Sequence, residues 1–128
     1  MQKYILIILL VATLCLSGCF QGNREEDITS EAQIYTQEFC NAWQSENYAV
    51  AASYMDDPEF IERMRDHEIA LKAFEITEVS MGEKHVTVKI DAELGSSTGN
   101  ESNIYEYDIK VEKINGRLRI TKMESKEG

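Results

Sequence analysis

The sequence predicts an α+β domain in which three N-terminal helices pack on one face of a four-stranded antiparallel sheet. Apolar residues recur at helical spacing up to about Ala73 and alternate with a period of two from there on. The alternating segments are apolar on one side and charged on the other, so one sheet face must be covered while the other meets water. Helices followed by strands are typical of α+β domains.

The first helix is expected to begin at Ser30, because Ser30 and Gln33 have the spacing of a capping box. Its aromatic face consists of Tyr35, Phe39, Ala42 and Trp43. The polar segment 45–47 interrupts the period, which restarts as a short second helix. The apolar side of this second helix consists of Tyr48, Ala51, Ala52 and Met55.

A third helix is predicted after Asp57, which is suited to an N-cap, with Pro58 at the first helical position. One side of this helix is expected to carry Phe60, Ile61, Met64, His67 and Leu71. The helical period ends near Ala73, so we expect the helix to end there.

Four strands follow. The first runs through Phe74, Ile76, Val79 and Met81, and the break in its alternation predicts a bulge near Thr77-Glu78. After a turn at 82–84, strict alternation predicts a strand at 86–94, with Val86, Val88, Ile90, Ala92 and Leu94 facing the helices.

The segment 95–103 is rich in Gly, Ser, Thr and Asn and is expected to be a mobile loop. The third strand alternates Tyr105, Tyr107, Ile109 and Val111 with charged residues. Asn115-Gly116 predicts a type I′ hairpin. In that register Val111 faces Ile120 on the covered side and Glu112 faces Arg119 on the wet side.

These patterns together predict a hydrophobic core large enough for independent folding. Its expected members are Phe39, Trp43, Tyr48, Ile61, Met64, Leu71, Ile76, Val88, Ile90, Ile109, Val111 and Ile120.

The N-terminal segment has the layout of a signal peptide. One basic residue, Lys3, precedes the apolar run 5–16, which is shorter than the roughly 20 residues that span a bilayer. The residues Leu16-Ser17-Gly18-Cys19 then resemble the lipobox of bacterial lipoproteins. This resemblance implies cleavage before Cys19, acylation of Cys19 with chains such as palmitate, and the division 1–18 signal peptide, 19–29 flexible tether and 30–128 single domain.

The resemblance also implies a location: a cell membrane, lipid-anchored and facing outside the cytoplasm. Phe20 is not the aspartate that retains lipoproteins at the inner membrane of enteric bacteria, so an outer membrane is allowed where one exists. With 23 acidic against 13 basic residues, the net charge of −10 disfavours nucleic acid as a partner. Attachment to the membrane is therefore expected to depend on the acyl chains.

Residues 39–51 resemble a pattern of the nuclear transport factor 2-like superfamily, in which a helix ending in Phe and Ala-Trp is followed by a polar turn and an aromatic residue. Here these are Phe39, Ala42, Trp43 and Tyr48, with Asn47 where a Gly-Asp type of turn is commoner. The likeness implies a curved sheet that closes with the helices into a cone, whose open end can hold a ligand or an active site. It is strongest to small lipoproteins that carry a domain of unknown function.

The inward positions of the strands contain almost no reactive side chains, whereas proton transfer needs a buried carboxylate or imidazole. We therefore expect no enzyme, no cofactor and no metal. Two separated histidines, His67 and His85, form no ligand cluster, and His85 is expected at the surface. Cys40 is expected to be a buried small hydrophobe, and no internal disulfide is possible once Cys15 and Cys19 are assigned to the signal peptide and the anchor.

The favoured function is a non-catalytic domain that binds a small apolar ligand, a cell-wall component or an envelope protein. The weak candidates for ligand contacts are Trp43, Tyr48, His67, Tyr105 and Tyr107, although aromatic residues in such positions more often belong to a core. One alternative is a small isomerase or cyclase that uses the cone cavity, with His67 or an acidic residue at a strand slip as the base. Another is a homodimer or larger homo-oligomer formed through the wet sheet face.

Overall fold

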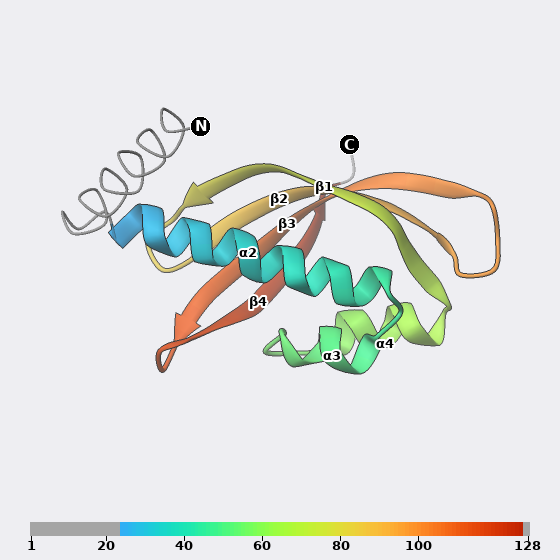
Figure 1. Ribbon diagram of the computed structural model, residues 1–128, viewed down its shortest axis with the longest axis horizontal. Helices are drawn as coiled ribbons and strands as arrows, with labels where there is room; N and C mark the ends of the chain where they lie inside the picture. Colours follow the sequence, from blue (N-terminus) through green and yellow to red (C-terminus); the bar gives the residue numbers. More distant parts are fainter. Residues whose placement is uncertain (1–23, 127–128) are drawn as a thin grey trace, which may run out of the picture.

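The computed structural model describes residues 24–126 of the protein and confirms the predicted α+β class. Three helices precede a meander in which each strand is antiparallel to the next, in the order β1-β2-β3-β4 (Figure 1). The elements are α2 (Arg24–Gln44), α3 (Tyr48–Ser53), α4 (Glu59–Asp66), β1 (Ile69–Met81), β2 (Val86–Ser96), β3 (Ser102–Ile114) and β4 (Arg117–Lys126).

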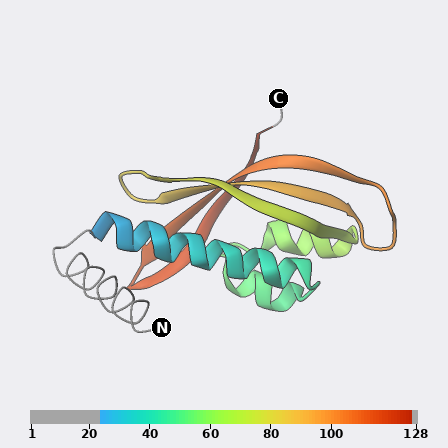
Figure 2. The same ribbon diagram turned by 45° about the horizontal axis from the view of Figure 1, so that its top comes forward.

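All three helices lie on the same face of the sheet, with α3 and α4 beside the C-terminal end of α2 (Figures 1 and 2). The core fills the space between α2 and the inner face of the strands. Its largest fully buried side chains are Trp43, Phe39, Ile61, Leu71, Ile90, Ile109, Ile120, Val86, Val88 and Val111.

The first helix is longer than the sequence predicted. It begins at Arg24, so Ser30 lies within it and cannot serve as its N-cap, and residues 24–29 are helical, not part of a tether. The reason is that the apolar period starts one turn earlier: Ile28 packs against the core, and Ala32 is completely buried one turn later.

The C-terminal end of α2 is closed by a Schellman motif. The N–H of Glu46 donates to the carbonyl of Trp43 and the N–H of Asn47 to that of Ala42, at 2.8 and 2.9 Å. Glu46 occupies the left-handed position with φ 59°, where glycine is the usual residue. This turn directs the chain into the predicted second helix, α3.

The third helix ends at Asp66, well before the predicted end near Ala73. Its start agrees to within one residue, and the Asp57 carboxylate accepts a hydrogen bond from the Glu59 N–H at 3.1 Å. Glu68 then takes a left-handed φ of 55° and the chain continues as β1. Leu71, predicted on the helix, is therefore a buried strand residue paired with Leu94.

Strand β1 bends over the helices because its ladder with β2 is interrupted twice. One register shift lies between Ile76 and Glu78, where the sequence predicted a bulge, and a second between Leu71 and Ala73. Extra residues in one strand increase its local twist and bend it. Strand β2 shows the predicted alternation of buried and half-buried residues from Val86 to Leu94.

The β3–β4 hairpin has the predicted register. Val111 pairs with Ile120 and Glu112 with Arg119, and the turn residues Asn115 and Gly116 both have positive φ, as a type I′ turn requires. The predicted loop 95–103 is shorter than expected, because the β2–β3 ladder extends to the pair Gly95 and Ser102.

The outer face of the sheet carries charge, as the alternation predicted. Ion pairs join Lys89 to Glu78, Lys126 to Asp108, and Lys110 and Lys122 to the same oxygen of Glu124, at 3.2 to 3.6 Å. The two lysines hold the pKa of the Glu124 carboxyl below its usual value by hydrogen bonding and charge.

Most of the predicted core is buried, while Tyr48, Met64 and Ile76 are half-buried at its edge. The list of expected core residues left out several buried hydrophobic residues, although Val86, Ala92 and Leu94 were expected to face the helices. The omitted residues are Ala32, Ala51, Met55, Ala70, Val86, Ala92, Leu94 and Tyr107, together with Cys40, which was expected to be buried.

Candidate functional site

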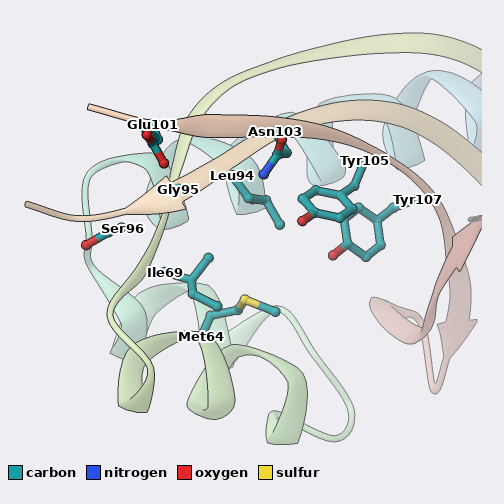
Figure 3. A pocket seen from close by; sticks show the side chains of 9 residues that line it. All are labelled: Met64, Ile69, Leu94, Gly95, Ser96, Glu101, Asn103, Tyr105 and Tyr107. Atoms are coloured by element: carbon teal, nitrogen blue, oxygen red, sulfur yellow. The ribbon is translucent and has the colours of Figure 1, made fainter. Parts of the chain in front are cut away.

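A pocket of about 470 Å³ opens where α4 meets the ends of β1, β2 and β3. Its walls come from one helix and three strands, so the fold itself shapes the cavity (Figure 3). The lining residues are Met64, Ile69, Leu94, Gly95, Ser96, Glu101, Asn103, Tyr105 and Tyr107.

Tyr105 and Tyr107 stand on the same side of β3 because they are two residues apart. Figure 3 shows the two rings side by side, with their hydroxyl ends toward the space between Leu94 and Met64. The Tyr107 ring meets Phe60 edge to face at 5.6 Å, and Phe60 meets Trp43 in the same way at 5.5 Å. This aromatic row fixes the Tyr107 wall of the pocket.

Two of the aromatic residues singled out in the sequence lie behind the pocket and do not line it. Trp43 is completely buried, and its indole N–H donates to the carbonyl oxygen of Ile69 at 3.4 Å. The Tyr48 hydroxyl donates to the same oxygen at 3.3 Å. Both therefore hold the first residue of β1, which itself lines the pocket, and burial raises the pKa of Tyr48.

His67 caps the C-terminal end of α4 and is exposed to solvent. It was predicted on the side of a longer helix, where it could turn inward. The early end of α4 removes it from that position, and it does not line the pocket. His85, expected at the surface, is half-buried, and its backbone oxygen accepts a hydrogen bond from the N–H of Gly82 at 2.7 Å.

Gly95 allows β2 and β3 to approach closely at the rim. A Cβ at this position would lie 2.3 Å from the carbonyl oxygen of Glu101, which no real contact permits. Any larger residue would push the two strand ends apart. The shape of the pocket mouth therefore depends on this glycine.

The sequence missed the residues that complete the pocket. Those that were not candidates for ligand contacts are Met64, Ile69, Leu94, Gly95, Ser96, Glu101 and Asn103. Ile69 was assigned to a helix and residues 95–103 to a loop, so their shared location could not be seen. One signal was available, because Ile69 and Leu71 already show a two-residue alternation, which resumes at Phe74 and Ile76 after one extra residue.

The polar side chains of the pocket are Ser96, Glu101, Asn103 and the two tyrosines, which can donate or accept hydrogen bonds. The pocket's single carboxylate, Glu101, is exposed at the rim. Within residues 24–126 no group of three or more His, Cys, Asp or Glu side chains is arranged to hold a metal ion. In the same range no helix is long and apolar enough to cross a bilayer.

Of the two cysteines expected to remain after cleavage, only Cys40 lies within the described residues. Cys40 is completely buried in the core, and burial raises the pKa of its thiol to about 12. Cys19 and the rest of the lipobox lie outside the described residues, so its acylation stays a prediction.

No protein-family model matches the sequence, and no curated protein matches it. Among solved structures, the chain is similar to the intermembrane space region of the chloroplast protein ARC6. The TM-score is 0.35 and the sequence identity 11%, over 70% of this chain and 92% of that one. This is a distant likeness of α+β architecture alone.

Proposed function

We propose that this protein is a lipid-anchored, extracytoplasmic binding protein whose nuclear transport factor 2-like cone holds a small, mainly apolar ligand. The observation that carries the proposal is the pocket of about 470 Å³ between α4 and the ends of β1 to β3. Its size lies within the usual range for small-molecule sites. The layout of residues 1–19 supports the location at a membrane.

The lining suggests the class of ligand. Met64, Ile69 and Leu94 offer apolar surface, while the Tyr105 hydroxyl and the Asn103 amide offer hydrogen bonds. Such a lining suits an uncharged molecule with an apolar body and one or two hydroxyl or carbonyl groups.

A binding role is favoured over an isomerase or cyclase because of where the titratable groups lie. A catalytic base needs a carboxylate or imidazole tuned by burial, whereas Glu101 is exposed and His67 lies outside the lining. A binding pocket needs no such group. Homo-oligomerisation through the outer sheet face is disfavoured by its alternating ionised side chains.

The binding proposal is tested with N-phenyl-1-naphthylamine, an uncharged apolar probe, added to the full chain in mild detergent. Met64→Trp fills the pocket and should weaken probe binding by about tenfold or more, which corresponds to about 1.4 kcal/mol. The matched control is Met81→Trp, the same change at an exposed residue at the other end of β1. Equal affinity of both variants, or no saturable binding by the wild type, would reject the pocket as the site.

The anchor is tested by mass spectrometry of protein extracted from membranes. We expect a chain that begins at Cys19 and carries acyl groups, and a Cys19→Ala variant that leaves the membrane fraction. A wild-type chain that is cut elsewhere or is unacylated would refute the anchor without touching the pocket proposal.

A further inference from the structure

A second groove lies on the other side of the helices, between α2, the end of α3 and the start of β4. It has a volume of about 520 Å³ and shares no residue with the pocket beside α4. We call it the arginine groove. Its lining consists of Tyr35, Ser53, Tyr54, Arg117, Leu118 and Arg119.

The two arginines are notable because acidic residues outnumber basic ones by 23 to 13, yet neither arginine forms an ion pair with any described carboxylate. Arg119 is held in place by a hydrogen bond from its Nη1 to the carbonyl oxygen of Ser53 at 2.7 Å. Burial raises the pKa of Tyr35, and a hydrogen bond between the Arg119 guanidinium and the Tyr35 hydroxyl acts against this rise. A guanidinium carries five N–H donors, so further N–H groups of Arg119 remain for a ligand. Arg117, two residues earlier on the same side of β4, is exposed.

The backbone of β4 adds a further donor between the two side chains. At Ile120 the outer edge of β4 is closed, because its N–H donates to Tyr54 O and its carbonyl accepts from the Asp56 N–H, both at 2.9 Å. Donors on one strand edge recur every second residue, so the Leu118 N–H points to the same edge. The Leu118 N–H faces the groove, and no backbone carbonyl of α3 or of the segment after α3 accepts a hydrogen bond from it.

The tyrosines form the walls of the groove and use their hydroxyls within the protein. Tyr35 donates to Tyr54 O at 2.9 Å, and Tyr54 donates to the Glu38 carboxylate at 3.3 Å. The rings meet edge to face at 4.9 Å, which makes a rigid apolar surface beside the arginines. Glu38 itself is not part of the lining.

We propose that the arginine groove binds the phosphate group of a phosphate ester. Two guanidinium groups and one backbone N–H supply more donors than the two oxygens of a carboxylate can use, whereas three or four phosphate oxygens can engage them all. The esterified group then lies against the Tyr35 and Tyr54 rings. The site is independent of the ligand pocket and of the anchor.

The test is calorimetric titration of the full chain in micelles of an uncharged detergent with phenyl phosphate and with benzoate, which share the same ring. Phenyl phosphate should bind at least about tenfold more tightly than benzoate. Arg117→Gln should lower the affinity for phenyl phosphate by about tenfold or more. Arg63→Gln should leave this affinity unchanged, although it changes the net charge equally, because Arg63 is an exposed residue of α4. Arg119→Lys keeps the charge but loses the planar fork, and should weaken binding similarly.

Equal affinity for the two ligands, or equal losses in the Arg117 and Arg63 variants, would overturn the proposal. Adding phosphatidylglycerol to the micelles distinguishes the sources of the phosphate. Competition with phenyl phosphate assigns the groove to a lipid headgroup, and its absence assigns it to a soluble ester.

Discussion

Cys40 shows how one buried side chain couples stability to pH. Burial raises the pKa of its thiol from 9.0 to about 12. The unfolded chain therefore releases this proton at a lower pH than the folded protein does. The contribution of the neutral thiol to the free energy of unfolding is fully present below about pH 9. It is lost as the pH rises toward about 12, by up to about 1.4 kcal/mol per pH unit.

We expect the free energy of unfolding, measured with urea from about pH 8 to about pH 11, to fall more steeply for the wild type than for Cys40→Ala. Burial also raises the pKa of Tyr35, Tyr48 and Tyr54, but these contribute equally to both proteins. Identical slopes would mean that the Cys40 thiol ionises as easily in the folded state as in the unfolded chain.

Thr36 is the one buried polar side chain of the described core whose hydroxyl has no hydrogen-bond partner there. Thr36→Val keeps the shape and removes the cost of burying that hydroxyl, so it should stabilise the protein by about 1 kcal/mol. Thr36→Ser, which keeps the hydroxyl and removes a methyl group, should destabilise it by a similar amount. Thermal unfolding of the pair decides, and a less stable valine variant would indicate that the hydroxyl is hydrogen-bonded after all.

At the level of elements, both α2 and α4 are followed by a glutamate in the left-handed conformation, Glu46 and Glu68. Glycine adopts this conformation without the steric cost of a Cβ. Glu46→Gly should therefore raise the free energy of unfolding by about 1 kcal/mol, although glycine is usually destabilising. Gln37→Gly, at an exposed position within α2, should lower the free energy of unfolding by a similar amount. A lower free energy of unfolding in both variants would contradict the left-handed conformation of Glu46.

The elements that local chemistry determines could be predicted from the sequence. The register of β3 and β4 beside the turn, from Ile114 to Val111, follows from Asn115-Gly116, because a two-residue turn leaves only one pairing there. The register shift between Lys110 and Val111 was not predicted. The end of α4 could not be predicted in this way. Residues 69–73 are as compatible with a helix as with a strand, and pairing with residues 93–96, distant in sequence, decides for the strand.

The same difference explains how much of the pocket was foreseen. Tyr105 and Tyr107 were candidates because strand alternation puts them on the inner face. Their partners Ile69, Leu94 and Asn103 come together only once β1 extends to residue 69 and β3 begins at residue 102. A motif of two aromatic residues can indicate a wall, but the cavity is a property of the assembled strands.

At the scale of the whole molecule, the negative charge is not evenly neutralised. Glu75, Asp91 and Glu106 pair directly across β1, β2 and β3, so three carboxylates lie in one row on the outer face. Like charges opposite one another are destabilising, and salt screens them. We expect the melting temperature to rise when about 0.5 M NaCl is added.

Asp91→Asn, in the middle of that row, should raise the melting temperature at low salt and reduce its salt dependence. Glu78→Gln offers the matched comparison, since it removes a carboxylate that pairs with Lys89 at 3.3 Å, and it should lower the melting temperature slightly. If both variants shift the melting temperature in the same direction, repulsion between the carboxylates of the row does not contribute measurably to stability.

The early start of α2 has a consequence for how the protein would sit on a cell surface. With Cys19 acylated as proposed, only residues 20–23 separate the lipid from the first residue of a helix that is packed into the domain. Even a fully extended segment of this length spans only about 15 Å. The domain would then move with its lipids in two dimensions, within the layer of headgroups and their counter-ions. It could capture molecules that leave or enter the bilayer, but it could not extend to a partner standing far above it.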